Sequence, residues 1–588
     1  MNKISELQSL MKRRGIYAYI VGTEDFHNSE YVGAYFRFRE YLSGFTGSAG
    51  TLLVTLDNAL LWTDSRYYIQ AAQQLSGSGI TLMKQEKGVP DIPGYLAEKM
   101  PDNSVCAFDG RCMATAAARS ISRRLSACGR GLSVDPAVVF SDEVWTDRPP
   151  LSAEKVFALP DEACGKSRAE KLGEIRSVIR QNKADAMFIS ALDEIAYMLN
   201  LRGGDIEYCP LFLAYMMIFA DRAVLFANPD IFSDEITLSL KNDGVEIRPY
   251  NEAERFFSEY DGKVMFDPKT VSCAFGGLGQ SENRLEITGP VPLMKAVKTP
   301  SEIKAVKYAH LRDGIAVTRF MKWLKSAVQS QSSGEITEIS LAEKLEEFRS
   351  LDPNYITQSF APIMAYGEHA AIVHYSATEQ TNSVIQPHGM LLSDTGGHYR
   401  YGTTDITRTY VLGEITDEER KAFTLVMAGH LNLMGAIFPD GVRGSTLDFT
   451  AREPLWHFGM DFGHGTGHGV GFLLNVHEGP QRISRHAVND APMKVGMITS
   501  DEPGYYAEGK FGIRHESLLL CCKAFHEGFL NFEPLTLVPF DSDGIDKRYL
   551  TKPQIRLYNQ YQQLVYEKLS PYLSKDEAEW LLKITQPI

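Results

Sequence analysis

The chain has 588 residues, which is too long for one hydrophobic core and predicts roughly three or four domains. Hydrophobic residues make up 44% and charged residues 23%, a balance typical of a folded protein rather than a disordered one. The formal net charge of −14 would repel a phosphate backbone or an anionic membrane surface, so neither nucleic acid nor membrane is an expected partner.

Targeting signals and cysteine spacing bear on the compartment. The amino-terminal residues have no apolar signal core behind them, and acidic residues occur early. The longest near-apolar run, residues 211–220, is too short to cross a bilayer. The cysteines are scattered without a C-x-x-C pair, which indicates free thiols in a reducing compartment. We therefore expect a soluble, cytoplasmic protein.

The first half of the chain repeats one pattern: an apolar strand, then a glycine-bearing segment, then a hairpin. The first copy comprises residues 15–21, 44–50, 51–56 and 59–63, and the second comprises residues 184–190, 201–205, 211–219 and 223–226. We interpret these copies as two α/β units of similar build, spanning residues 1–155 and 156–290. A chance likeness between two generic α/β patterns is the alternative.

A third region begins with a helix start signal. Thr299, Pro300 and Glu302 form a capping-box pattern in front of an apolar-periodic segment. Glycines and histidines are dense from there to about residue 525, so we expect the chemistry in residues 291–525. A helix-rich tail, residues 526–588, follows.

Acidic residues and glycines cluster between residues 392 and 409. Apolar residues at 390–392 and 410–412 predict two antiparallel strands around a glycine-containing turn, with Asp394 and Asp405 facing each other across the pair. Two carboxylates brought together repel unless they share a proton or a cation. For either residue alone, ordinary turn chemistry is the alternative.

A glycine-rich run, GHGTGHGVG, occupies residues 463–471, and His477 and Glu478 follow it. Glycines between histidines let the backbone pass close to a bound group. The G-x-G-x-x-G and G-x-x-x-x-G-K patterns of nucleotide sites are absent, as is the H-E-x-x-H pattern of single-zinc metalloproteases. A structural glycine loop with surface histidines is the alternative.

Two glutamates, Glu502 and Glu516, each stand beside an apolar run, at 495–498 and 518–520. A hairpin would bring them together, although solvated turn glutamates are the ordinary interpretation of each one alone.

The acidic and imidazole groups indicate a metal site only when they are considered together. Four carboxylates and one imidazole come from Asp394, Asp405, His468, Glu502 and Glu516. Two divalent cations would neutralise the four carboxylates, and oxygen-rich ligation favours manganese or cobalt over a thiolate-selected zinc. Two such ions about 3.5–4 Å apart activate a water and polarise a carbonyl, which indicates metal-assisted hydrolysis.

These motifs, in this order, resemble those of aminopeptidase P, the Xaa-Pro aminopeptidases. That family belongs to the pita-bread metallopeptidases together with methionine aminopeptidase and prolidase. The segments that carry the resemblance are DTGG at 394–397, GTTDITRT at 402–409, HGTGHGVG at 464–471, DEPG at 501–504 and GIRHE at 512–516. Residues 29–31, 43–45, 62–64 and 200–203 resemble the two N-terminal domains of the long, three-domain cytosolic type, and residues 532–536 and 585–588 resemble its C-terminal extension.

The resemblance implies an α/β and α+β chain, in which two creatinase-like N-terminal α/β domains are followed by a pita-bread catalytic domain. The implied domains are 1–155, 156–290, 291–525 and the C-terminal extension 526–588. The implied cofactors are two divalent metal ions, most simply Mn²⁺. Asp394 would be a ligand of one metal, Asp405 and Glu516 would bridge both, and His468 and Glu502 would complete the other.

The remaining implied roles concern the substrate. Glu502 would be the general base for a water bridging the two metals. His374 and His477 would orient the scissile carbonyl and stabilise its oxyanion, and His464 would lie near the substrate. Arg39, in the N-terminal half, would reach the substrate from outside the catalytic domain.

The expected function is release of the residue before a penultimate proline, so the expected partners are peptides with N-terminal Xaa-Pro. The resemblance also implies a homodimer, which we expect to be held by the C-terminal region around Trp580, Leu581 and Leu582. Two alternatives stay open: a prolidase, which takes only Xaa-Pro dipeptides, and a pita-bread domain that serves as a metal-free binding module.

Overall fold

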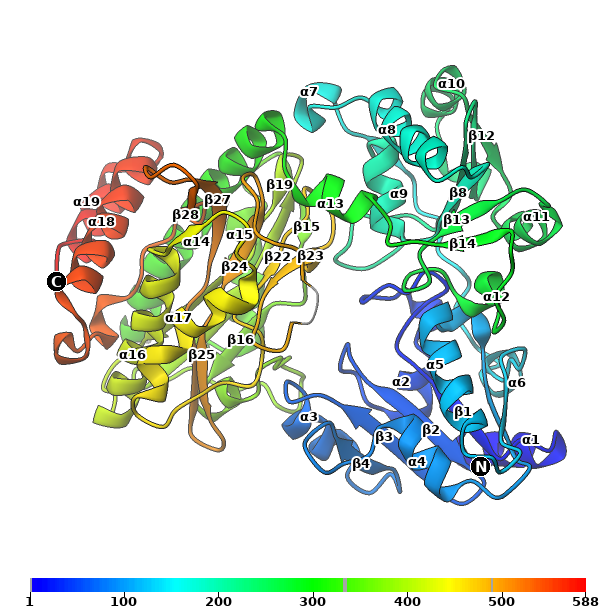
Figure 1. Ribbon diagram of the computed structural model, residues 1–588. Coiled ribbons are helices and arrows are strands. Elements are labelled where there is room, and N and C mark those ends of the chain that lie inside the picture. The colour runs from blue at the N-terminus through cyan, green and yellow to red at the C-terminus, as the bar shows by residue number, and fades with distance from the viewer. Residues whose placement is uncertain (1–2, 331–335, 488–489) are drawn as a thin grey trace. The chain divides into compact units, whose positions relative to one another are not determined.

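The computed structural model describes residues 3–330, 336–487 and 490–588, and its chain divides into two compact units (Figure 1). The amino-terminal unit comprises Met1–Asp161 and Lys166–Val291, and the carboxy-terminal unit comprises Glu162–Gly165 and Pro292–Ile588. Short helices, α7 (Asp161–Cys164) and α13 (Val291–Ala296), lie where the chain passes from one unit to the other.

Two six-stranded sheets form the amino-terminal unit. The first has the order β4-β3-β2-β1-β5-β6 and the second the order β12-β11-β10-β8-β13-β14. The strands of the first are β1 (Ala18–Val21), β2 (Thr51–Thr55), β3 (Ala59–Thr63), β4 (Thr81–Lys84), β5 (Val105–Phe108) and β6 (Ser133–Asp135). Those of the second are β8 (Ala186–Ile189), β10 (Ala214–Phe219), β11 (Ala223–Ala227), β12 (Val245–Arg248), β13 (Val264–Phe266) and β14 (Arg284–Glu286).

The two sheets confirm the repeat expected from the sequence. In each, a central buried strand pairs antiparallel with the first strand of a hairpin and parallel with a later strand. Helices α1 (Lys3–Arg13), α2 (Phe38–Ser43), α3 (Tyr68–Gln74), α4 (Ile92–Lys99), α5 (Thr115–Ser126) and α6 (Ser141–Val144) accompany the first sheet. Helices α8 (Arg168–Gln181), α9 (Leu192–Leu199), α10 (Asp234–Asn242), α11 (Ala253–Glu259) and α12 (Cys273–Gly276) accompany the second, and a small sheet pairs β7 (Phe157–Ala158) with β9 (Leu201–Arg202).

The carboxy-terminal unit is built on short antiparallel sheets, with orders β15-β18-β19, β16-β17-β20, β21-β28-β27-β24-β22-β23 and β25-β26. The strands up to residue 439 are β15 (Tyr355–Gln358), β16 (Ile363–Tyr366), β17 (Met390–Thr395), β18 (Gly397–Tyr399), β19 (Gly402–Thr403), β20 (Ile406–Val411) and β21 (Ile437–Pro439). The later ones are β22 (Gly467–Gly469), β23 (Glu478–Ile483), β24 (Ile498–Asp501), β25 (Gly504–Ala507), β26 (Phe511–Arg514), β27 (Ser517–Lys523) and β28 (Phe529–Pro534).

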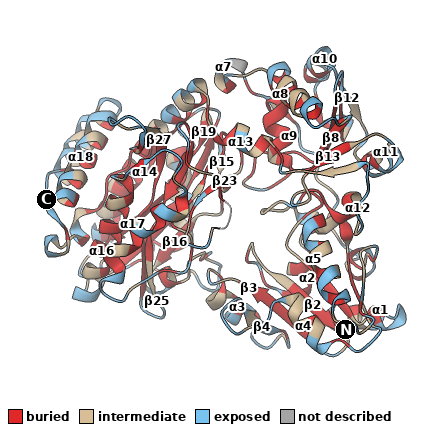
Figure 2. Ribbon diagram, viewed as in Figure 1, coloured by how far each residue is buried: buried red, intermediate tan, exposed pale blue. Residues whose placement is uncertain are grey.

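Long helices cover these sheets, and Figure 2 shows the strands as mainly buried and the outer helix faces as exposed. They are α14 (Pro300–Ser330), α15 (Glu338–Arg349), α16 (Asp417–Met434), α17 (Gly444–Trp456), α18 (Lys552–Leu569) and α19 (Lys575–Ile584). The capping box expected before α14 forms, because Thr299 N donates to Glu302 Oε2 at 2.8 Å and Glu302 N donates to Thr299 Oγ1 at 3.2 Å.

The apolar residues of the carboxy-terminal helices complete a core of this unit. Tyr558, Tyr561 and Val565 of α18 and Leu581 of α19 are buried in one cluster with residues of the sheets and of α16 and α17. Deep burial of such side chains is the main favourable term of folding. Among the described residues, none of the helices combines the length and the apolar character that a membrane span requires.

Candidate active site

Antiparallel pairing of β17 and β20 positions two of the predicted ligands. Asp394, near the end of β17, lies opposite Thr407, and Asp405 directly precedes β20. Because residues two apart on a strand share a face, Asp405 lies on the same face as Thr407 and therefore as Asp394. The expected strand pair is confirmed, but its connection is more than a turn: β18 and β19 lie within it and pair in a different sheet.

A second strand pair positions the two glutamates. β24 pairs antiparallel with β27, with Asp501 opposite Ser517, and Glu502 and Glu516 stand directly outside that last pair. The hairpin of β25 and β26 connects them. The two glutamates are thus brought together by the same kind of antiparallel pairing as the two aspartates, as the sequence predicts.

His468 belongs to β22, and the glycines of β22 allow this strand to lie between β24 and β23. A Cβ at Gly467 would lie 2.0 Å from the Ser500 carbonyl oxygen, and one at Gly469 would lie 2.2 Å from that of Glu478, so only glycine fits. His468 Nδ1 lies 2.9 Å from the Gly469 carbonyl, which makes Nδ1 the donor and, in the neutral ring that a bound cation requires, leaves Nε2 with a lone pair.

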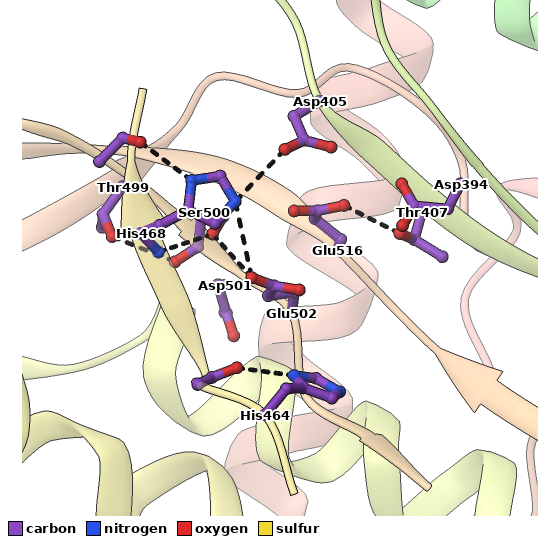
Figure 3. A network of polar contacts seen from close by, with 12 residues as sticks. Asp394, Asp405, Thr407, His464, His468, Thr499, Ser500, Asp501, Glu502 and Glu516 are labelled. Carbon is purple, nitrogen blue, oxygen red and sulfur yellow. Dashed lines mark hydrogen bonds and ion pairs between the residues drawn. The ribbon is translucent and has the colours of Figure 1, made fainter. Parts of the chain in front are cut away.

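The side chains of Asp405, His468, Glu502 and Glu516 lie close to one another, as Figure 3 shows. His468 Nε2 lies 3.4 Å from Asp405 Oδ2 and 3.6 Å from Glu502 Oε1. Asp405, His468 and Glu516 each offer a ligand atom within 4.8 Å of the other two. Asp394 lies beside this group, and its Oδ1 is buried with no hydrogen-bond partner in the described part of the chain.

Burial and mutual repulsion dominate the electrostatics of this cluster. Burial raises the pKa of the Glu516 carboxyl well above its usual range, and the neighbouring carboxylates raise it further. Burial likewise raises the pKa of Asp394 and of Glu502. Burial lowers the pKa of His468, but the carboxylates of Asp405 and Glu502 outweigh it and raise that pKa to about 9. A cluster of buried acids with an orphaned oxygen fits bound divalent cations, which would stabilise the ionised carboxylates.

Arg514 and Tyr506 join this cluster, although the sequence analysis missed them. Arg514 Nη2 donates to Asp394 Oδ2 at 2.6 Å, and Nη1 donates to Tyr506 Oη at 2.7 Å. Tyr506 Oη lies 2.8 Å from His464 Nε2, and His464 Nδ1 donates to the Gly465 carbonyl, so Tyr506 donates to His464. The available signal was proximity in sequence: Arg514 stands two residues before Glu516.

The remaining predicted histidines also lie in the carboxy-terminal unit. The rings of His477 and His468 meet edge to face, with centroids 4.4 Å apart. The residue before His374, Val373, accepts a hydrogen bond from Arg514 Nη2 through its carbonyl at 3.4 Å. His477 is therefore in contact with a predicted ligand, and the His374 segment is in contact with the arginine that holds Asp394.

A buried glutamate forms contacts in each of the segments that carry His477 and His374. Glu478, next to His477, has Lys298 Nζ 2.6 Å from Oε1 and Lys295 Nζ 2.9 Å from Oε2, and all three side chains are buried. Glu338, at the start of α15, accepts from the Tyr375 hydroxyl at 2.8 Å and contacts His369 Nδ1 at 2.9 Å. Neither glutamate stands in a motif from which its role could be predicted.

Arg39 lies in the amino-terminal unit, in α2. Its side chain is buried, with an exposed fraction of 5% for the residue, and its guanidinium lies over the Phe45 ring at 4.9 Å. Nη2 donates to the Gly47 carbonyl, whereas Nε and Nη1 have no hydrogen-bond partner among the described residues. The substrate contact expected of Arg39 stays a prediction.

Sequence comparison finds matches along the whole chain. The creatinase/prolidase N-terminal domain matches residues 3–138, and a second description of that domain matches residues 147–302. Metallopeptidase family M24 matches residues 304–523, and the C-terminal region of peptidase M24 matches residues 528–588. The expected fold class is therefore confirmed: two creatinase-type N-terminal domains followed by an M24 pita-bread domain.

Individual relatives match end to end. Xaa-Pro aminopeptidase 1 of Dictyostelium discoideum is 37% identical and covers 100% of this chain and 96% of its own. Aminopeptidase P1 of Arabidopsis thaliana is 34% identical, with coverage of 100% and 99%. The crystal structure of X-prolyl aminopeptidase from Caenorhabditis elegans, described as a cytosolic enzyme with a di-nuclear active site, superposes with a TM-score of 0.96 at 35% identity, with coverage of 100% and 99%. This chain belongs to the M24 metallopeptidases and, within them, to the Xaa-Pro aminopeptidase family.

Proposed function

We propose that this chain hydrolyses the bond between an N-terminal residue and a penultimate proline, with two divalent metal ions as cofactors. The observation that carries the proposal is the buried cluster of carboxylates around His468, in a chain similar along its full length to proteins named Xaa-Pro aminopeptidase. The relative from Caenorhabditis elegans is described as di-nuclear, which supports two ions rather than one.

The metals would be held by five side chains. Asp394 would serve one ion, His468 and Glu502 the other, and Asp405 and Glu516 both. The central place of Asp405 and Glu516 beside His468 supports their assignment as shared ligands. Four carboxylates and one imidazole favour an oxygen-preferring ion, so we propose manganese. When bound, two such ions make a water acidic and polarise a carbonyl oxygen.

A side chain of the protein, the Glu502 carboxyl, would carry out the proton transfers. Glu502 would accept a proton from the attacking water, and the same carboxyl would return it to the proline nitrogen, which leaves as a secondary amine. Because an Xaa-Pro bond is a tertiary amide without N–H, that nitrogen has to be protonated before it departs. The position of Glu502 at the edge of the cluster, 3.6 Å from His468 Nε2, supports this double role.

The other histidines would bind the substrate. His477 and His374 would donate to the scissile carbonyl as charge develops on its oxygen. His464 would lie near the peptide, and Tyr506 would fix its ring, since the Tyr506 hydroxyl occupies Nε2 and the Gly465 carbonyl occupies Nδ1. Arg39 would contact the peptide beyond the scissile bond.

Assembly and location belong to the same proposal. We propose a homodimer in the cytosol, the compartment named for the relative from Caenorhabditis elegans. The stretch that suggested the dimer contact is partly used within the subunit, because Leu581 is fully buried and Trp580 packs against the same core. Leu582, which is 44% exposed, is the residue of that stretch left for a partner.

Substrate length separates this function from the two alternatives. The purified chain, loaded with Mn²⁺, would be assayed with Xaa-Pro dipeptides and with Xaa-Pro-Xaa peptides of the same first residue. The proposal expects hydrolysis of the longer peptides. Hydrolysis of dipeptides alone would indicate a prolidase, and neither activity nor bound metal would indicate a binding module.

A further inference from the structure

A buried ion pair lies behind the strands that carry Asp394 and Asp405. Asp313 of α14 and Arg349, the last residue of α15, are 36 residues apart in sequence, and their side chains are 0% and 2% exposed. Arg349 Nε lies 2.8 Å from Asp313 Oδ1, and Nη2 lies 3.2 Å from Oδ2. This two-point contact between a planar guanidinium and a carboxylate fixes orientation as well as position.

The arginine also holds the end of β17. Arg349 Nη2 donates to Thr395 Oγ1 at 3.1 Å, and Nη1 donates to the Gly396 carbonyl at 3.2 Å. Thr395 and Gly396 directly follow Asp394 in the chain. The guanidinium therefore holds the backbone on the carboxyl side of that aspartate.

The aspartate holds the start of β20. Thr404 Oγ1 donates to Asp313 Oδ2 at 2.5 Å, and the Tyr399 hydroxyl donates to Oδ1 at 2.9 Å. Thr404 directly precedes Asp405, and its carbonyl accepts a further hydrogen bond from Ser359 Oγ at 2.9 Å. A single ion pair thus contacts both chain segments on which the two aspartates sit.

The pair lies on the opposite face of the strands from the aspartates. Asp394 is paired with Thr407, and Thr395 with Ile406. Since side chains alternate between faces, Asp394 and Asp405 project to one side, and Thr395 and Thr404 to the other. The ion pair contacts the second side only, so it acts on the aspartates through the backbone and not through their oxygens.

A contribution to stability does not by itself account for this arrangement. A buried ion pair adds little net stability relative to an apolar pair of similar volume, because both charges lose their water. What an apolar pair lacks is the set of directed hydrogen bonds to Thr395, Gly396 and Thr404. Those bonds set the distance between the two segments, and hence the spacing of the carboxylates that face the site.

We propose that Asp313 and Arg349 are positioning residues for the metal centre, which set the spacing of Asp394 and Asp405 for two cations. This inference rests on the proposed function, because it takes the two aspartates as metal ligands. It adds residues outside the ligand set to those on which metal affinity depends.

The test measures binding of Mn²⁺ to the full-length chain by titration calorimetry. Arg349→Met and Thr404→Val are each expected to weaken Mn²⁺ binding about tenfold or more, the usual effect of removing a group that orients a ligand. Thr404→Val keeps the shape of the side chain and removes the hydroxyl that donates to Asp313 and accepts from Gly397 N at 2.9 Å, so it tests the same connection between the two segments where Arg349→Met fails to fold. Unchanged affinity in Thr404→Val would overturn the proposal.

A paired apolar replacement separates position from stability. Arg349→Met combined with Asp313→Leu removes both charges at once, so thermal stability is expected to recover relative to Arg349→Met alone. Mn²⁺ affinity is expected to stay low, because the contacts to Thr395 and Thr404 are still missing. Recovery of affinity together with stability would show a merely structural role and overturn the proposal.

Two further variants make the result unambiguous. Lys325 pairs with Asp541 at 2.5 Å, and Asp541 accepts from Val411 N at the far end of β20, so Lys325→Met removes a partly buried ion pair away from the cluster. Its Mn²⁺ affinity is expected to match the parent chain, and a tenfold loss there would overturn the proposal. Asp405→Asn tests the ligand set itself: if it too binds Mn²⁺ normally, the proposed function fails, whereas loss in Asp405→Asn without loss in Thr404→Val fails the positioning proposal alone.

Discussion

The ammonium group of Lys298 lies 2.6 Å from Oε1 of Glu478, and both side chains are fully buried. Lys298 also donates to the carbonyl of Lys295, whose own ammonium lies 2.9 Å from the other oxygen of Glu478. One carboxylate therefore serves two buried cations, at the point where the chain enters the carboxy-terminal unit. Glu478 is the neighbour of His477, so this contact fixes the segment that presents the histidine.

We expect Glu478→Gln to destabilise the protein severely, because two buried lysines would lose their counter-charge. Removal of one partner from a buried ion pair typically costs about 3–5 kcal/mol. Glu533→Gln is the matched control, since Glu533 pairs with Lys307 at the surface, where both side chains are more than 40% exposed. Such surface pairs contribute roughly 0–1 kcal/mol. Urea unfolding of the two variants checks the contrast, and equal losses would contradict it.

We expect His477→Ala and His374→Ala to retain metal while losing most activity. Both are assigned to the substrate, and one donor to a developing oxyanion is typically worth about 10²–10³ in rate. Metal content by mass spectrometry and kcat on an Xaa-Pro-Xaa peptide test this. Loss of metal from either variant would move that histidine into the ligand set, and His457→Ala, on an exposed side chain paired with Glu453, serves as the control.

The sequence was most informative where chemistry is local. Both glutamates and both aspartates stand at the ends of apolar runs, and antiparallel pairing of those runs is what brings them together. The repeated strand-and-hairpin pattern of the first half likewise predicts two α/β units of similar build, and two sheets with matching strand order form there. In these cases a residue's role follows from the period of its own strand and from the turn beside it.

Contacts between distant segments could not be predicted in this way. Lys298 and Glu478 are 180 residues apart, and nothing in the sequence distinguishes a buried lysine from a solvated one. The same holds for Arg349 at the end of α15, because a basic residue in the last turn of a helix is a common feature and does not indicate burial. The sequence likewise predicts only a turn between Asp394 and Asp405, because the pairing of β18 with β15 depends on a strand some forty residues earlier.

We expect Asp405→Asn and Glu516→Gln each to abolish turnover and to lower metal content. Each substitution keeps the shape of the side chain but removes a charge that the proposal shares between both ions. Two measurements are needed on the same sample: bound metal per chain and kcat. A variant that keeps two metals and near-parent activity would refute the shared assignment. Asp543→Asn, in which the altered carboxyl is 66% exposed and pairs with Lys325, is the control for the loss of one negative charge.

We expect the contact between His369 and Glu338 to make part of the stability depend on pH. The hydrogen bond that His369 Nδ1 donates to the Glu338 carboxylate raises the pKa of His369 above its ordinary value of about 6.5, and the stacked Tyr375 ring lies 4.5 Å away. A histidine with a raised pKa in the folded state stabilises fully below the ordinary pKa and loses that contribution as the pH rises through the raised one. His369→Phe keeps the stacking and removes the charge.

The melting temperatures of the parent chain and His369→Phe should therefore differ more at about pH 5.5 than at about pH 9. Comparison of the two proteins at each pH cancels the titration of all other groups. A difference that is constant across this range would show that the ion pair contributes nothing, and a difference that grows with pH would reverse the assigned sign.

We expect Arg39→Ala to slow the hydrolysis of longer peptides more than that of Xaa-Pro dipeptides, because the proposed contact lies beyond the scissile bond. A hydrogen bond to a charged group is worth about 1.5–3 kcal/mol, so kcat/KM for an Xaa-Pro-Xaa-Xaa peptide should fall roughly tenfold or more. Nε and Nη1 of this buried guanidinium have no hydrogen-bond partner among the described residues. The substitution also removes the bond to the Gly47 carbonyl and the contact with Phe45, so the melting temperature is measured alongside.

Arg37→Ala is the control, because it removes a neighbouring arginine from a surface pair with Glu207. It should leave kcat/KM unchanged for both the dipeptide and the longer peptide. Equal losses on dipeptide and longer peptide in Arg39→Ala would assign Arg39 to the fold of its own unit instead.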